Sequence, residues 1–201
     1  CAQEDLKIVK EEAKYKDIIR TPDIDVYRQL PQKVKFCYKW GLEHTTAKWF
    51  IKLDDDSVGQ IDTFGSYLNE TNTSEEYVVV GHVANGLDVH RSGKWAENEN
   101  NYKPTKYPKF PLGSVGHVVS KSVATYIVKN ADTLFNYQGE DVSIGIWLNE
   151  SPFKNKVKWV QVHQTLRRRL AQDHQEAVYT ERTSGQCGDS SASIGESKIT
   201  A

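Results

Sequence analysis

The chain has 201 residues, of which 38% are hydrophobic and 26% charged, a composition typical of a globular domain with a substantial core. Its 26 basic and 27 acidic residues leave a net charge of −1. This charge argues against nucleic acid and anionic membrane surfaces as partners, because both attract proteins through an excess of positive charge. No apolar stretch approaches the roughly 18 residues of a membrane-spanning helix.

Helical and strand-like patterns alternate along most of the chain. Runs of β-branched and aromatic residues predict strands, and apolar residues at intervals of three and four predict helices. In chain order the predicted elements are a helix at 4–15, a strand at 17–20, a helix at 26–41, a strand at 48–53, a helix at 60–69, strands at 77–82 and 115–119, helices at 121–130 and 140–148, and a strand at 157–162. The tripeptide Thr21-Pro22-Asp23 is typical of a helix start. This order indicates an α/β fold with a mixed sheet.

Two segments lack a repeating apolar pattern. Residues 84–112 combine Gly, Asn, Pro and Lys with aromatic side chains that are costly to leave in water, which predicts a long functional loop. Residues 181–201 are rich in Ser and Gly and predict a flexible tail. We therefore expect one domain over residues 1–180, followed by this tail.

The most informative motif is the acidic triplet Asp54-Asp55-Asp56, which ends the predicted strand at 48–53. Three adjacent carboxylates cannot all be ionised without a cation or a set of hydrogen-bond donors. Carboxylate oxygens bind Mg²⁺ and Mn²⁺, and ligands of open α/β sheets bind beyond the carboxyl ends of the strands. The triplet therefore indicates a divalent-metal site, and the alternative is an acidic turn that caps the following helix.

The pair Glu140-Asp141 is a second candidate site, because it lies at the start of a predicted helix. One of these carboxylates could act as a general base that deprotonates a hydroxyl nucleophile. The alternative is that both acids only stabilise the helix N-terminus through its dipole.

A third candidate comprises Lys94-Trp95 and the segment 107–116, which contains Gly113 and Gly116. Aromatic rings stack on the faces of sugars, and glycines allow a ligand to approach the backbone closely. Packing within the loop is the alternative. The six histidines are scattered, and none has metal-ligand spacing with another.

Taken in chain order, these segments resemble the β-1,3-galactosyltransferase family, which includes β-1,3-N-acetylglucosaminyltransferases and relatives of Fringe. The resemblance spans roughly residues 11–150. The motifs that carry it are Glu12, Tyr15–Ile19, Asp25–Leu30, Lys39-Trp40, Lys52–Asp56, Lys94-Trp95, Tyr107–Phe110, Gly116–Ser120 and Glu140–Gly145.

The resemblance implies a GT-A fold and a type II Golgi membrane protein with a lumenal catalytic domain. It implies an inverting hexosyltransferase that moves galactose or an N-acetylhexosamine from a UDP-sugar. The acceptor would be a hydroxyl of a glycan, glycoprotein or glycolipid, and the new linkage would be β-1,3.

The resemblance also implies roles for individual residues. Asp56 and Asp54 would hold Mn²⁺ (or Mg²⁺), and His174 is the nearest candidate for a further ligand from the C-terminal part of the chain. Asp141 would be the general base, with Glu140 beside it. The residues expected around the nucleotide and the donor sugar are Asp54, Asp55, Lys52, Trp95, Gly113 and Gly116.

The chain departs from the family pattern at its beginning. It starts at Cys1, contains no methionine and lacks the usual first strand of the nucleotide-binding fold. We therefore expect a processed or truncated piece of a longer protein, with the membrane anchor outside it. One alternative function is a catalytically dead homologue that binds UDP or assists assembly. Another is a Ca²⁺-dependent carbohydrate-binding module, which we rank lower because Ca²⁺ takes about six to eight oxygen ligands.

Overall fold

The computed structural model describes residues 2–24, 26–54, 68, 77–113, 116–162 and 194–198. Its helices are α1 (Ala2–Tyr15), α2 (Leu30–His44), α4 (Lys121–Lys129) and α5 (Glu140–Glu150), with short 3-10 helices η1 (Tyr27–Gln29) and η3 (Lys154–Lys156). Its strands are β1 (Ile18–Ile24), β2 (Trp49–Lys52), β3 (Val78–Gly81), β4 (Val83–Ala84), β5 (Phe110–Pro111), β6 (His117–Ser120), β7 (Lys158–Gln161) and β8 (Ile194–Lys198). The predicted helix at 60–69 lies outside the described residues, apart from Leu68.

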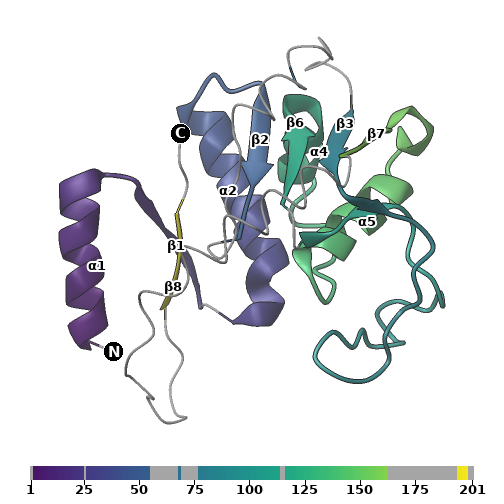
Figure 1. Ribbon diagram of the computed structural model, residues 1–201, viewed down its shortest axis with the longest axis horizontal. Helices are drawn as coiled ribbons and strands as arrows, with labels where there is room; N and C mark the ends of the chain where they lie inside the picture. Colours follow the sequence, from purple (N-terminus) through teal and green to yellow (C-terminus); the bar gives the residue numbers. More distant parts are fainter. Residues whose placement is uncertain are drawn as a thin grey trace.

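The central sheet has four strands in the order β2-β6-β3-β7 (Figure 1). Strand β6 runs antiparallel to both β2 and β3, whereas β7 runs parallel to β3. The predicted mixed sheet is therefore confirmed. Among the described helices, none is both long and apolar enough to cross a membrane.

The register of this sheet brings several chain segments to one edge. Lys52 ends β2 and Gly81 ends β3, and both pair with His117 at the start of β6. Because β7 is parallel to β3, its last residue, Gln161, pairs with Gly81 at the same edge. The chain that leaves β2 and the chain that enters β6 are consequently neighbours, and this is the edge at which open α/β sheets bind ligands.

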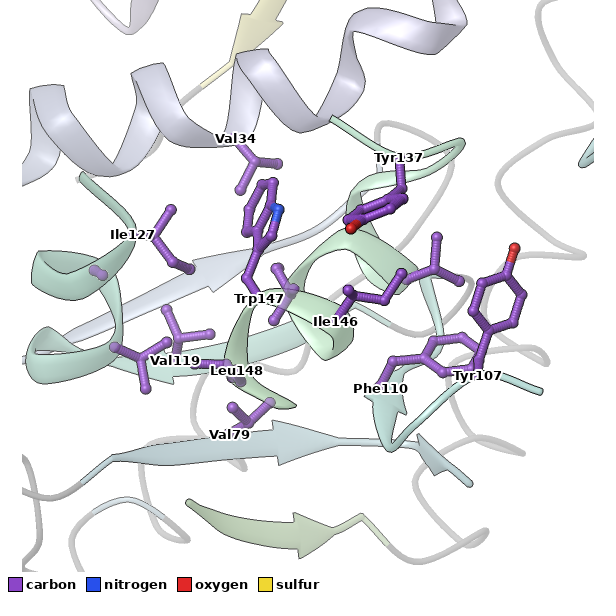
Figure 2. Packing of buried hydrophobic residues seen from close by; sticks show 14 of the residues in the cluster. Val34, Val79, Tyr107, Phe110, Val119, Ile127, Tyr137, Ile146, Trp147 and Leu148 are labelled. Atoms are coloured by element: carbon purple, nitrogen blue, oxygen red, sulfur yellow. The ribbon is translucent and has the colours of Figure 1, made fainter. Parts of the chain in front are cut away.

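Each face of the sheet has its own apolar core, because side chains alternate between the faces of a strand. On one face, Val79 and Val119 pack against α2, α4 and α5, with the fully buried Trp147 of α5 between Val34 and Ile127 (Figure 2). On the opposite face, a smaller cluster contains Val78, Val80, Val118, Leu68 and Val162. The larger core therefore packs α5 against the sheet, together with α2 and α4.

Local sequence explains where two of these helices begin. The Ser120 hydroxyl accepts a hydrogen bond from the Val123 amide and caps α4, as the sequence predicted. Helix α5 begins after Gly139, whose backbone is extended, and has Glu140 and Asp141 in its first turn. Acidic residues at this position are favourable because the helix N-terminus carries partial positive charge.

The predicted helix start at Thr21-Pro22-Asp23 is wrong, because these residues belong to β1. Strand β1 pairs antiparallel with β8, and the register shifts between Arg20 and Ile24. Proline has no N–H to donate to a ladder and is tolerated at such irregular positions. Strand β8 itself lies within residues 181–201, where the sequence indicated a tail.

The long loop follows β4 and extends from the sheet as far as β5, which pairs back onto β4 (Figure 1). Helix α5 packs closely on the end of this loop at Gly145. A Cβ atom there would lie 2.6 Å from the Lys109 carbonyl oxygen and would clash with the Phe110 side chain. Gly145 is thus the position that allows α5 and β5 to touch.

We expect Gly145→Ala to lower the free energy of unfolding by about 1–3 kcal/mol, because the new methyl group overpacks the contact between α5 and β5. Alanine is otherwise the better helix former, so a loss of stability would isolate the steric effect. Urea denaturation measures it. Asn149→Ala, at an exposed position of the same helix, is the matched control and should change stability by less than about 0.5 kcal/mol. An equally stable Gly145→Ala protein would contradict the close packing.

Candidate functional site

Lys52 joins the two acidic motifs at the edge of the sheet. Its ammonium group donates hydrogen bonds to the carboxylate of Asp54, which follows β2, and to Oε1 of Glu140 at the start of α5, at 2.6 Å. The side chains of Lys52 and Glu140 are only 16% and 7% exposed. Two segments separated by almost ninety residues are therefore held together by one buried cation.

The electrostatics of this group favour a charged lysine. Burial by itself would lower the pKa of Lys52, but the charge of Glu140 and the hydrogen bonds to Asp54 and Glu140 outweigh burial, so this pKa is raised. Lys52 therefore remains a cation at neutral pH. A buried Glu140 carboxylate without this partner would be costly to keep ionised.

Asp141 has a different environment from the adjacent Glu140. Its Oδ1 accepts a hydrogen bond from the Val142 amide at 2.7 Å, and its Oδ2 accepts one from the Gly113 amide at 3.2 Å. Burial, followed by the negative charge of Glu140, raises the pKa of Asp141 to about 6. A carboxylate with such a pKa is mostly ionised at neutral pH and still basic enough to accept a proton.

Three glycines shape the backbone around these carboxylates. A Cβ atom on Gly113 would lie 3.4 Å from Glu140 Oε1 and 3.5 Å from Asp141 Oδ2, so the backbone here lies directly against both acids. A Cβ on Gly139 would lie 2.9 Å from Asp141 Oδ1. Gly116 has a φ of +73°, and a Cβ there would lie 2.6 Å from the Lys52 carbonyl oxygen. A side chain would therefore crowd the Lys52 backbone at Gly116 and the Asp141 carboxylate at Gly139, whereas at Gly113 a Cβ would make ordinary contacts with both acids.

His117 lies beneath the site in the sheet and is completely buried. Burial, with a smaller contribution from the charge of Lys52, lowers the pKa of His117 to about 3. Its Nε2 is 3.4 Å from the Tyr38 hydroxyl of α2, and its Nδ1 has no hydrogen-bond partner within the described part of the chain. His117 is therefore a neutral group at physiological pH.

The structure brings most of the predicted site residues together. Those that share the edge are Lys52, Asp54, Gly113, Gly116, Glu140 and Asp141. Trp95 is not part of this hydrogen-bonded group. It lies in the loop, 53% exposed, with the Lys94 ammonium 5.7 Å from its ring centroid.

The proposed metal ligands are only partly described. Asp54 lies at the edge, whereas Asp55, Asp56 and His174 fall outside the described residues. Within the ranges that the structure describes, no three His, Cys, Asp or Glu side chains form a group that could hold a metal ion. The carboxylate of Asp54 nevertheless supplies the kind of hard oxygen donor that Mg²⁺ and Mn²⁺ prefer.

Sequence reasoning did not single out three buried residues near the site or in the loop beside it, namely Tyr38, His117 and Glu97. Tyr38 has an apolar neighbourhood typical of a core position, and His117 is one of six scattered histidines. Glu97 is one of three acids in an aperiodic loop, where charged residues are usually exposed. The burial of Glu97 follows from tertiary contacts that no local pattern signals.

Comparison with known proteins gives the family of the chain. A family model described as galactosyltransferase matches residues 2–158, most of the sequence. The chain belongs to the galactosyltransferase family. The predicted resemblance is confirmed, and the mixed α/β architecture is consistent with a GT-A-like fold.

Individual relatives agree with this family assignment. The chain is 34% identical over 146 residues to the human protein named UDP-GalNAc:beta-1,3-N-acetylgalactosaminyltransferase 2, a match that covers 73% of this chain and 29% of the relative. The protein of the same name from Xenopus tropicalis is 33% identical over 147 residues, covering 73% and 30%. Hydroxyproline O-galactosyltransferase GALT6 of Arabidopsis thaliana is 28% identical over 164 residues, covering 81% and 24%. The chain thus spans less than a third of the length of these galactosyltransferase-family relatives.

The raised pKa of Asp141 predicts a pH-dependent effect on stability. Between its ordinary value of 3.8 and about 6, the folded protein holds this proton more tightly than the unfolded chain does. The free energy of unfolding therefore falls as the pH rises through this range. Asp141→Asn removes this titrating group. We therefore expect the difference in the free energy of unfolding, variant minus wild type, to rise by about 2–3 kcal/mol from about pH 3 to about pH 7.5.

Urea denaturation at several pH values measures this difference. Glu150→Gln, which removes an exposed carboxylate at the opposite end of α5, is the control and should show no such trend. A constant difference between Asp141→Asn and wild type across the pH range would contradict the raised pKa.

Proposed function

We propose that this protein is a UDP-sugar-dependent, inverting hexosyltransferase that forms a β-1,3 linkage to a hydroxyl of a glycan, glycoprotein or glycolipid. Membership of the galactosyltransferase family supports glycosyl transfer. The names of two relatives include UDP-GalNAc, and the name of a third includes galactosyl transfer. UDP-GalNAc and UDP-galactose are therefore the first donors to test. The family resemblance also leads us to propose the Golgi lumen as the site of action.

The observation that carries this proposal is the different environment of two adjacent carboxylates. Glu140 is paired with Lys52, whereas Asp141, among the described residues, accepts its hydrogen bonds from two backbone amides and has a pKa of about 6. Two adjacent acids in such different environments are typical of a division between a structural charge and an acid or base. We assign Asp141 as the base on this ground.

In the proposed reaction, the Asp141 carboxylate accepts the proton of the acceptor hydroxyl. The hydroxyl oxygen then forms a bond to the anomeric carbon of the donor, and the bond from that carbon to the β-phosphate oxygen breaks. UDP leaves with the electron pair of the broken bond. Attack from the face opposite UDP inverts the anomeric configuration, and one base is sufficient for this displacement.

The donor side of the proposed site is the edge that follows β2. Asp54 and Asp56 would hold Mn²⁺ or Mg²⁺, His174 remains the candidate for a further ligand, and Asp55 would lie beside the nucleotide. When bound, the ion supplies Lewis-acid neutralisation of charge on the diphosphate. Lys52 and the backbone at Gly113 and Gly116 would position the nucleotide and its sugar. Trp95, exposed on the loop, would offer an aromatic surface to a sugar ring.

We expect Asp141→Asn to lower the rate of sugar transfer by at least about 10²-fold, because the acceptor hydroxyl loses its base. Binding of UDP should remain within a few-fold of wild type, since Asn preserves the shape of the side chain. Transfer is measured from UDP-GalNAc and UDP-galactose to a panel of β-linked acceptor glycosides, and UDP binding is measured by calorimetry.

Glu150→Gln is the matched control in this assay and should transfer sugar at the wild-type rate. An unchanged rate in Asp141→Asn would overturn the assignment of the base. A wild-type protein that binds UDP but transfers no sugar from any donor would favour a catalytically dead homologue instead.

A further inference from the structure

Glu97 is a buried carboxylate in the middle of the long loop, and only 2% of it is exposed. Its Oε2 accepts a hydrogen bond from the Gln138 amide at 2.6 Å, and its Oε1 accepts one from the Asn98 amide at 2.9 Å. Burial of a carboxylate is costly unless its oxygens are hydrogen-bonded. The two backbone amides are therefore what allows Glu97 to be buried.

The partner of Glu97 is close to the proposed base in sequence and in structure. Gln138 lies three residues before Asp141, in the short turn that leads into α5. The remainder of this turn is fastened by Ser143 of α5, whose hydroxyl accepts from the Tyr137 amide at 3.2 Å and donates to the Gly139 carbonyl at 2.6 Å. The hydrogen bond from Gln138 to Glu97 connects this turn to the long loop, which belongs to neither the turn nor α5.

The backbone of Glu97 is itself firmly held. Its amide donates to the His90 carbonyl at 2.8 Å, and its carbonyl accepts from the Arg91 guanidinium at 3.1 Å. The preceding carbonyl, of Ala96, accepts a hydrogen bond from the guanidinium of Arg28, a residue of η1, at 3.0 Å. The Glu97 carboxylate is therefore presented from a fixed position.

The Glu97 contact connects the loop to the carboxylate of Asp141. One oxygen of Asp141 depends on the Gly113 amide, which follows β5 at the end of the same loop. If the turn at Gln138 moved, the distance between Asp141 and Gly113 would change. Small displacements of a reacting group lower rates strongly, about 10²-fold for 1 Å.

We propose that Glu97 is a positioning residue, which holds the turn before α5 and thereby sets the place of the Asp141 carboxylate. The consequence for catalysis rests on the proposed function, whereas the effect on Asp141 itself does not. Glu97 touches no reacting atom in this scheme and acts through Gln138.

Two variants test the role of Glu97 in transfer. Glu97→Leu removes both acceptors at similar size, and Glu97→Gln keeps one. We expect kcat to fall at least about tenfold in Glu97→Leu and about threefold in Glu97→Gln, with KM for the UDP-sugar within about twofold of wild type. Asp88→Asn, which removes an exposed ion pair with Lys106 in the same loop, is the control and should leave both constants unchanged.

The second measurement does not require activity. The pKa of the Asp141 carboxyl is measured in each variant by ¹³C NMR, with Asp141→Asn to assign the signal. We expect this pKa to differ from the wild-type value in Glu97→Leu, and by less in Glu97→Gln. A displaced carboxylate changes both its burial, which raises the pKa, and its hydrogen bond from the Gly113 amide, which lowers it. The charged residues that influence the pKa of Asp141, namely Glu140 and Lys52, are the same in every variant.

The results separate the two proposals. A wild-type protein without transfer would reject the proposed function, and the titration would still decide the role of Glu97. An unchanged pKa of Asp141 in the Glu97 variants would overturn the positioning role. The positioning role would also be overturned if the Glu97 variants had the wild-type kcat, or if their loss of rate came entirely from a higher KM. If Glu97→Leu does not fold, Glu97→Gln decides by the same criteria.

Discussion

The site depends on one buried ion-paired lysine. Lys52 ends β2 and lies between the carboxylates of Asp54 and Glu140. Without a cation at this position, the end of β2 and the start of α5 would bring like charges together in a partly buried space. The Lys52 ammonium removes that conflict, so the acidic motif of a strand and that of a helix can share one edge. The glycines at 116 and 139 then supply the room that this close approach requires.

The same arrangement separates the roles of Glu140 and Asp141, although the two are neighbours in the sequence. Glu140 turns towards Lys52 and is neutralised by it, whereas Asp141 turns towards backbone amides. Burial and the charge of Glu140 then raise the pKa of Asp141 towards neutrality. One acid therefore maintains the architecture, and the other is available for chemistry. Glu97 extends this architecture by linking the long loop to the turn that precedes both acids.

Much of the fold could be predicted from the sequence because its strands and helices have strong local patterns. The run Val78–Val80 and the segment Val118-Val119 are β-branched and became the centre of the sheet. Ser120 marked the start of α4, and Gly139 with two acids marked the start of α5. The triplet after β2 and the acidic pair of α5 could be recognised separately as candidate sites for the same reason.

Features set by contacts between distant segments could not be predicted in this way. Thr21-Pro22-Asp23 has the local chemistry of a helix start, but the pairing of its neighbours Arg20 and Ile24 with β8 places it within a strand. The bridge made by Lys52 joins motifs that are remote in sequence, and they meet because α5 packs on β5 and on the core beside the end of β2. Glu97 has the local signature of an exposed loop residue, and its burial depends on Gln138.

The measurement that most directly tests this account is calorimetric titration of UDP into the purified protein, first with Mn²⁺ and then with EDTA. The account predicts saturable binding in the presence of the metal that is lost in EDTA, because carboxylates at the end of β2 are proposed to bind the diphosphate through the ion. Absence of UDP binding under both conditions would contradict the claim that this edge of the sheet is a nucleotide-sugar site.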